Sequence, residues 1–224
     1  MKISIINSLL GIALILSACS KAEQPTADKQ PLPEQEISED KTLQDLAIAH
    51  KLTLAQMIDS AAGETEDFSD TFKGFLLSDQ GVQEVSESKA LEQFEQVLDS
   101  PKKSLDLPFF EVINTDSVIL LAKGRGVTAL ILVDKPQLTI QKLVFLANSQ
   151  TEKLGSRNQD LQAQFAGTTI TFSPNNFGIK PWDEPKFQGD VQIDGISGAT
   201  DICQSALDML NEQLPRYQAY FTAE

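Results

Sequence analysis

Apolar residues recur every three or four positions between residues 42 and 107, a spacing typical of amphipathic helices. The pattern predicts helix over 42–62, with Thr53 as an N-cap within it and Gly63 as its stop. Two further apolar stripes continue the spacing up to Pro101. Their members are Phe68, Phe72, Phe75, Leu76, Leu91, Phe94, Val97 and Leu98. We therefore expect 42–107 to be a small helical region whose aromatic side chains form core.

The spacing changes after Pro108, where short runs rich in Val, Ile and Leu alternate with turn signals such as Gly124-Arg125-Gly126. These runs predict an antiparallel meander, followed by a helix over 201–214. The C-terminal half therefore predicts an α+β fold in which helices pack on an antiparallel sheet. The expected strands are 118–122, 127–133, 143–147, 168–172 and 189–193.

The N-terminus has the parts of a secretory signal, with Lys2 before an apolar run from Ile3 to Leu16. This run is short for a membrane span, which needs about 20 apolar residues. It ends in Leu-Ser-Ala-Cys at Cys19, which resembles the lipobox of bacterial lipoproteins, where the Cys becomes the first residue and carries lipid. An ordinary signal peptide with an incidental Cys is the alternative. The resemblance favours a lipid-anchored protein of the bacterial cell envelope, facing the periplasm or the cell exterior.

The chain divides into four parts on this basis. Residues 1–18 are the signal peptide. Residues 19–41 hold three Pro and many charged and amide side chains, so they cannot bury enough surface to fold and are expected to be a disordered linker. The helical region 42–107 follows, and a folded domain spans 108–224.

Composition excludes several kinds of function. Acidic residues outnumber basic ones 32 to 18 and the net charge is −14, which argues against a nucleic-acid binder because polyanions are repelled. Two Cys exclude a disulfide scaffold. His50 is the only His, and no metal site is expected around it.

The stretch with the most chemical content runs Asp-Gly-Ile-Ser-Gly-Ala-Thr, from Asp194 to Thr200, between an expected strand and an expected helix. Gly195 and Gly198 allow tight backbone paths, and Ser197 and Thr200 are candidate N-caps. The free N–H groups and the positive dipole end of the following helix suit a phosphate, although a capped turn without ligand explains the same residues. The chain has no G-x-x-x-x-G-K motif, so a nucleotide P-loop is not supported.

This stretch resembles the flavinylation motif of the FMN-binding domain family, whose members include flavin-bearing components of the Na⁺-translocating NADH:quinone reductase and of the Rnf complex. In that family the last Thr or Ser of D-x-x-S-G-A-[ST] holds FMN through a phosphoester bond. The resemblance implies that Thr200 is the attachment residue, that Ser197, Gly198 and Ala199 shape the turn, and that Asp194 begins the motif. A transferase that uses FAD as donor makes this bond, so Thr200 is implied to be its substrate side chain, and no catalytic residue is implied.

A second segment, residues 150–155, occupies the place of the family's E-T-P-G-L-G loop, which lies by the flavin. Further on, Phe165-Ala166-Gly167 resembles the F-x-G that often follows that loop. The resemblance covers roughly residues 110–214. The matching residues of the loop are Thr151, Leu154 and Gly155, and the departures are Gln150, Glu152 and Lys153.

The sequence also departs from the family after Thr200, where Asp201-Ile202-Cys203 replaces the usual x-T-S. The carboxylate of Asp201, in the first turn of a helix, interacts favourably with the helix dipole but repels a phosphate.

Together these features predict a lipid-anchored envelope flavoprotein that carries covalent FMN on Thr200 and transfers electrons in a respiratory or redox chain. Its implied partners are an FAD-dependent flavin transferase, a redox partner protein in the envelope, and the membrane through the lipid anchor. No NADH fingerprint or acid–base set is evident, which favours an electron carrier over a stand-alone enzyme. The alternatives are a flavin-free lipoprotein that binds or scaffolds a respiratory complex, and a flavin-dependent reductase. No residue of 42–107 is assigned to the cofactor, so we expect that region to be dispensable for flavin attachment.

Overall fold

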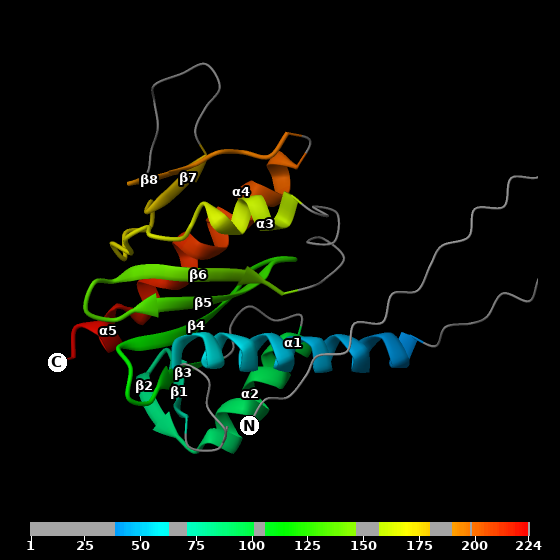
Figure 1. Ribbon diagram of the computed structural model, residues 1–224, viewed down its shortest axis with the longest axis vertical. Helices are drawn as coiled ribbons and strands as arrows, with labels where there is room; N and C mark the ends of the chain where they lie inside the picture. The colour runs from blue at the N-terminus through cyan, green and yellow to red at the C-terminus, as the bar shows by residue number, and fades with distance from the viewer. Residues whose placement is uncertain are drawn as a thin grey trace, which may run out of the picture. The chain divides into compact units, whose positions relative to one another are not determined.

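A six-stranded antiparallel sheet lies at the centre of the fold, with the strand order β2-β1-β3-β4-β5-β6 (Figure 1). The computed structural model describes residues 39–62, 71–100, 106–146, 157–179, 190–197 and 199–223. The signal peptide, most of the linker with Cys19, the loop residues Thr151, Leu154 and Gly155, and Gly198 lie outside them. The strands are β1 (Phe72–Ser78), β2 (Gly81–Val85), β3 (Leu107–Val112), β4 (Ser117–Lys123), β5 (Thr128–Asp134) and β6 (Thr139–Phe145).

Strands β4 and β5 form the longest hairpin of the sheet, pairing from Ser117 with Asp134 to Lys123 with Thr128. Every residue of β4 is buried, which explains why this strand has a continuous apolar run rather than an alternating one. The turn between the strands closes through a 2.8 Å hydrogen bond from the Gly124 N–H to the Val127 carbonyl. The expected meander is confirmed.

Helices cover both faces of the sheet, and two neighbouring residues of β3 show which helix covers which face. Phe110 makes an edge-to-face contact with Phe94 of α2 (Glu87–Asp99), with ring centroids 6.2 Å apart. Phe109 points to the opposite face of the sheet, where its ring makes an edge-to-face contact with the ring of Tyr217, with centroids 5.4 Å apart. Helix α1 (Glu39–Ala62) lies on the α2 side and contacts β3, β4 and β5 (Figure 1). The opposite face carries α4 (Thr200–Gln213), the 3₁₀ helix η2 (Leu214–Tyr217) and α5 (Gln218–Phe221).

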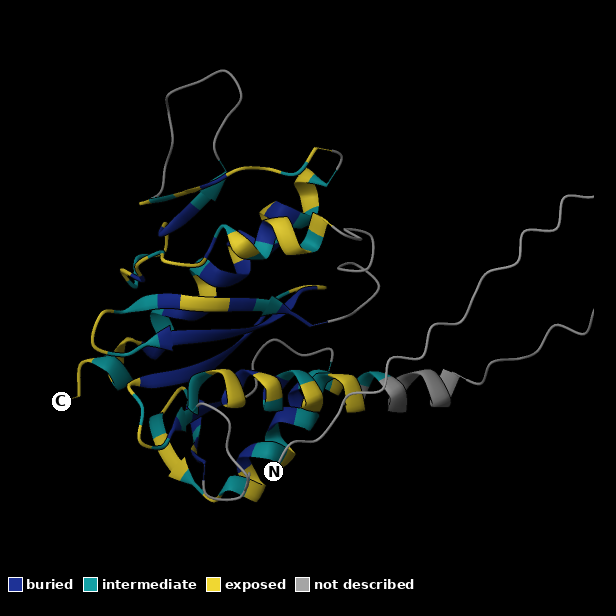
Figure 2. Ribbon diagram, in the orientation of Figure 1, coloured by how far each residue is buried: buried dark blue, intermediate teal, exposed yellow. Residues whose placement is uncertain are grey.

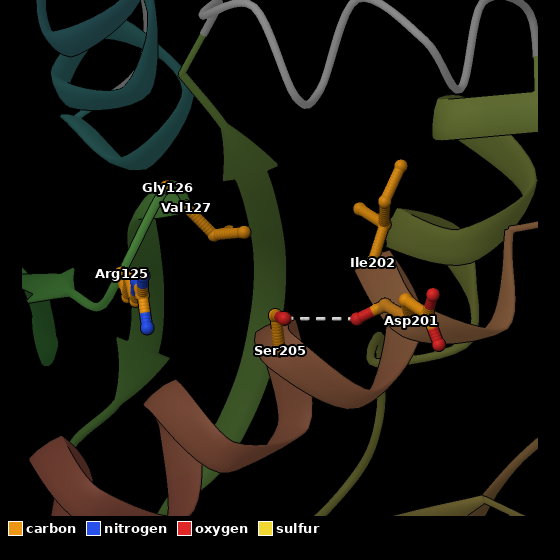
Figure 3. Close-up of a pocket in the computed structure, with 6 residues that line it drawn as sticks. All are labelled: Arg125, Gly126, Val127, Asp201, Ile202 and Ser205. Carbon is orange, nitrogen blue, oxygen red and sulfur yellow. Dashed lines mark hydrogen bonds between the residues drawn. The ribbon is translucent and has the colours of Figure 1, made fainter.

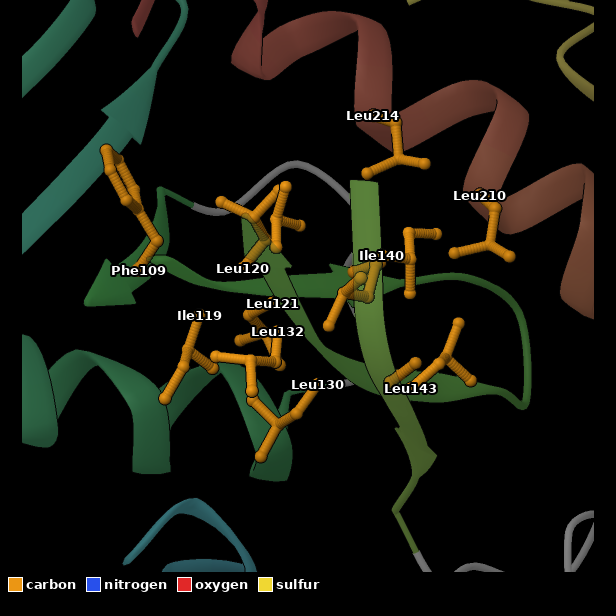
Figure 4. Packing of buried hydrophobic residues seen from close by; sticks show 14 of the residues in the cluster. Phe109, Ile119, Leu120, Leu121, Leu130, Leu132, Ile140, Leu143, Leu210 and Leu214 are labelled. Carbon is orange, nitrogen blue, oxygen red and sulfur yellow. The ribbon is translucent and has the colours of Figure 1, made fainter. Parts of the chain in front are cut away.

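The core is continuous through the sheet, and the buried positions concentrate in its central strands (Figure 2). On the α4 side, Leu210 and Leu214 lie over Ile140 and Leu143 of β6 (Figure 4). These four side chains are at most 2% exposed, so they contribute to stability mainly through apolar area removed from water. This packing fixes α4 on the sheet, and with it the position of Thr200 at the start of the helix.

The predicted α+β fold class is confirmed, but the expected helix around Phe72 and Phe75 is wrong. Helices α1 and α2 are present, whereas residues Phe72–Val85 form the β1–β2 hairpin. Phe75 pairs across strands with Phe109, and their rings stack at 5.0 Å. This cross-strand pairing overrides the helix-like spacing. Thr53 lies within the uninterrupted α1, where its hydroxyl donates to the Ala49 carbonyl at 2.9 Å instead of capping a helix.

A small second sheet contains β7 (Phe177–Ile179) and β8 (Val191–Ile193), which pair in parallel. Strand β8 confirms the expected strand near 189–193. The strand expected over 168–172 is instead a single bridge between Thr139 and Thr169. The short helix α3 (Arg157–Ala163) was not expected, because its sequence is almost entirely polar.

Candidate functional site

The loop from Asp194 to Thr200 joins the end of β8 to the start of α4. Thr200 is the first residue of α4 and is exposed, and Ala199 is the N-cap. Ala199 donates its N–H to the Ile196 carbonyl at 2.9 Å, which closes a turn just before the helix. Asp194 and Ser197 are exposed in the same loop. The described residues of the predicted motif therefore form one accessible segment.

Among the described residues no side chain caps the start of α4, so the predicted N-cap roles of Ser197 and Thr200 are wrong. The Ala199 carbonyl accepts from the N–H groups of Ile202 at 3.1 Å and Cys203 at 3.0 Å, which begins the helix without a capping hydroxyl. The hydroxyl of Thr200 therefore makes no capping hydrogen bond at the start of α4. An uncapped helix start keeps its positive dipole end and N–H groups available to an anion.

Helix α3 holds the motif loop at two points, which sequence reasoning missed. Gln164, just after α3, accepts from the Asp194 N–H at 2.6 Å and donates to the Asp194 carbonyl at 3.2 Å. At the other end, Arg157 Nη1 donates to the Ser197 carbonyl at 2.6 Å. The only sequence signal for these contacts is that α3 lies between the 150–155 segment and Phe165-Ala166-Gly167, both singled out by the family resemblance.

A cavity of about 330 Å³ lies between the β4–β5 turn and the first two turns of α4 (Figure 3). Its opposing walls carry charges of opposite sign, with Arg125 on the turn and Asp201 on the helix. In the part of the chain that the structure describes, Arg125 has no ion-pair partner. Ser205 lies between them and donates its hydroxyl to the Asp201 carbonyl at 2.8 Å. The lining residues are Arg125, Gly126, Val127, Asp201, Ile202 and Ser205.

Two glycines give this turn its shape and its closeness to α4. Gly126 has φ of 76°, a conformation that favours glycine. A Cβ placed on Gly124 would lie 2.8 Å from Cβ of Met209, so only glycine lets the turn approach α4 this closely. The glycine pair that the sequence suggested as a turn signal therefore also sets the width of the cavity.

The described residues fit an FMN phosphoester. Thr200 provides an accessible hydroxyl, the uncapped start of α4 provides donors for phosphate oxygens, and the cavity beside it is at the small end of the range for small-molecule sites. The carboxylate of Asp201 repels a phosphate, and the guanidinium of Arg125 lies across the cavity from Asp201. No described helix has the length and apolarity to cross a membrane, and the described residues contain no cluster of three His, Cys, Asp or Glu side chains.

The chain is similar to one protein family over part of its length. The model of the FMN-binding domain family matches residues 123–214, which confirms the resemblance seen in the motif. The matched segment begins at the end of β4 and ends after α4, so it includes the β4–β5 turn, both cavity walls and Thr200.

Among solved structures, the fold is similar to the crystal structure of NqrC from Shewanella oneidensis, with a TM-score of 0.54 and 18% sequence identity. The likeness covers 79% of this chain and 98% of that chain. It therefore extends to elements before residue 123, where the family match begins. The comparison with curated proteins gave no match.

Proposed function

We propose that this protein is an electron-carrying flavoprotein that holds FMN through a phosphoester to Thr200. The observation that carries the proposal is the exposed Thr200 hydroxyl at the uncapped start of α4, within the segment that matches the FMN-binding domain family. The cavity beside this segment, with the cation of Arg125 on its wall, favours the flavoprotein over the flavin-free alternative.

The attachment follows from the chemistry of FAD. Oγ1 of Thr200 forms a bond to the FMN phosphorus of FAD, the pyrophosphate P–O bond breaks, AMP leaves, and the hydroxyl proton passes to a base of the flavin transferase. No oxidant or reductant is needed, because the reaction exchanges one phosphoryl bond for another.

Bound FMN supplies one- and two-electron chemistry. Thr200 would tether the group to α4, and the N–H groups at the start of that helix would hold its phosphate oxygens. Arg125 and Asp201 set the charge on the two cavity walls. The proposed redox partner is a protein of the same compartment, and the sequence contains no evident NADH-binding fingerprint.

Mass spectrometry of the intact protein after co-expression with a flavin transferase tests the attachment. Wild type is expected to carry one FMN-sized adduct, and Thr200→Val, which keeps the shape and removes the hydroxyl, is expected to carry none. Thr200→Ser and Ser197→Ala are matched controls that keep an acceptor oxygen at position 200, so both are expected to retain labelling. An adduct that persists in folded Thr200→Val would reject Thr200 as the attachment residue. An unlabelled wild type would reject covalent FMN and favour the flavin-free binding module.

We further propose that Cys19 is lipidated and tethers the protein to a membrane of the bacterial envelope. The Leu-Ser-Ala-Cys segment after a short apolar run supports this. Cys19→Ala is expected to stay unprocessed or to leave the membrane fraction. A variant that fractionates and migrates like wild type would overturn the anchor.

A further inference from the structure

The motif loop is held by two side chains that come from one other segment of the chain. Gln164 makes a reciprocal pair of hydrogen bonds with the backbone of Asp194, at 2.6 and 3.2 Å. Arg157 makes a 2.6 Å hydrogen bond to the backbone of Ser197. Both contacts are to backbone groups, so they depend on the path of the loop rather than on its side chains.

The side-chain amide of Gln164 makes the same pair of hydrogen bonds to the backbone of Asp194 that a residue of a neighbouring strand would make. Its oxygen accepts a hydrogen bond from the backbone N–H of Asp194, and its nitrogen donates one to the backbone carbonyl. One side chain therefore satisfies both backbone polar groups of Asp194. The contact follows the last residue of β8, where the two-stranded sheet ends. Gln164 therefore fixes the direction in which the chain leaves the sheet.

Arg157 fixes the other end, three residues before Thr200. A guanidinium has five N–H donors, and the contact with the Ser197 carbonyl occupies one nitrogen. Arg157 also brings a positive charge to a segment flanked by the carboxylates of Asp194 and Asp201. The charge favours the approach of a phosphate-bearing donor to this segment.

We propose that Arg157 and Gln164 are positioning residues for flavin attachment, which hold the loop from Asp194 to Thr200 in the conformation that the flavin transferase accepts. This inference rests on the proposed attachment of FMN to Thr200. A loop that is preorganised in its bound conformation loses less conformational entropy when it binds in the active site of the transferase. Neither residue takes part in the phosphoryl exchange, in which Thr200 gains FMN and FAD loses AMP.

The test measures the rate of labelling of the full chain by a purified transferase with FAD as donor. Arg157→Gln and Gln164→Ala are each expected to lower kcat/KM about three- to tenfold, mainly through KM, in line with the loss of one or two hydrogen bonds. Arg157→Lys, which keeps the charge and a donor, is expected to recover part of the rate. All of these variants are expected to reach full labelling at long times, because Thr200 is unchanged.

Gln159→Ala is the matched control for Gln164→Ala, since Gln159 is an exposed residue of α3, the helix that directly precedes Gln164, and makes no hydrogen bond to the described residues of the motif loop. Its kcat/KM is expected to equal that of wild type. Amide hydrogen exchange of residues 194–200 in the unlabelled proteins gives a second readout. It is expected to be faster in Arg157→Gln and Gln164→Ala and unchanged in Gln159→Ala. Gln164→Glu, which keeps the shape and one of the two hydrogen bonds, serves if Gln164→Ala does not fold.

The outcomes separate the two proposals. If wild type is labelled, and the folded Arg157 and Gln164 variants are labelled with wild-type kcat/KM, the positioning role is wrong and the attachment to Thr200 stands. If exchange of the loop is faster but kcat/KM is unchanged, the loop is held for stability only and the positioning role is also wrong. If wild type takes no label, both proposals are rejected.

Discussion

The ammonium group of Lys123 donates a 2.5 Å hydrogen bond to the Ser100 carbonyl at the C-terminal end of α2. The same group also donates to the carbonyls of Val97 and Leu98. Lys123 is the last residue of β4 and directly precedes the turn that lines the cavity, so this contact joins α2 to the cavity wall. A cation at the C-terminal end of a helix is favoured by the helix dipole. Burial lowers the pKa of Lys123, and the carboxylate of Asp99 partly opposes this.

Lys123→Met is expected to destabilise the protein by about 1.5–3 kcal/mol, because it leaves the last carbonyls of α2 without their charged donor. Chemical denaturation measures this as a lower midpoint with an unchanged slope. Lys142→Met, at an exposed position of β6, is the control and is expected to change stability by less than about 0.5 kcal/mol. Equal midpoints for the two variants would show that the Lys123 contact contributes nothing measurable.

Removal of all residues before 105 is expected to prevent folding. The truncation deletes β1, the pairing partner of β3, and it deletes Phe72 and Phe94, which pack edge-to-face on Phe110. The expectation that the region 42–107 is dispensable for flavin attachment considered only residues near the cofactor, and it applies only to a truncated protein that folds. Circular dichroism and a cooperative unfolding transition decide the point. A truncated protein that folds and accepts FMN would show that the region is dispensable after all.

Local sequence was enough to predict the parts of the fold whose pattern has a single explanation. The runs of Val, Ile and Leu between turn signals predicted β4 and β5, and the helical spacing of apolar residues over 201–214 predicted α4. Phe72 and Phe75 were ambiguous, because apolar and polar residues do not alternate along the sequence of β1. The contacts that decide the structure there are with Phe109 and Phe110, more than 30 residues away.

In the candidate site, too, local sequence predicted some residues, and others depend on contacts between distant parts of the chain. Thr200 was proposed from the sequence because a contiguous motif marks it. Arg157 and Gln164 were not found, because their hydrogen bonds reach 40 and 30 residues along the chain to backbone groups, which leave no trace in the sequence. Arg125 was seen only as part of a turn. Its place opposite Asp201 depends on the close approach of Gly124 to Met209, which is a tertiary contact.

Tyr217 is expected to make the stability of the protein sensitive to alkaline pH. Its hydroxyl is buried and donates to the Leu121 carbonyl at 2.7 Å, and burial raises its pKa well above the ordinary value of 10, with Arg216 and this hydrogen bond opposing the shift. Since the folded state keeps the proton that the unfolded state loses, stability is retained below pH 10 and falls as the pH rises further.

Urea unfolding between pH 8 and 11 is expected to show a steeper loss of stability in wild type than in Tyr217→Phe. Both proteins keep Lys123, whose lowered pKa acts in the opposite direction, so its effect cancels in the comparison. Parallel stability curves for the two proteins across this range would contradict the assignment to Tyr217.

Arg125 and Asp201 face the same cavity with opposite charges, and we expect them to shift the reduction potential of bound FMN in opposite directions. Reduction adds electrons to the flavin, so a nearby cation favours the reduced form and a nearby anion disfavours it. Arg125→Gln is expected to lower the midpoint potential and Asp201→Asn to raise it. A tenfold change in the reduction equilibrium corresponds to about 30 mV for a two-electron couple, and shifts of this order are expected.

Spectroelectrochemical titration of the labelled proteins measures these shifts, and the visible spectrum reports whether the flavin is bound in the same way. Both shifts are expected to shrink as salt is raised, because Arg125 and Asp201 are exposed and their charges are screened. Lys89→Gln is the control, since Lys89 is an exposed residue of α2 on the opposite face of the sheet from α4. Its midpoint potential should match that of wild type. Shifts of the same sign in Arg125→Gln and Asp201→Asn would mean that the variants disturb the packing around the flavin rather than its charge, and would remove the cavity from the electrostatic environment of the cofactor.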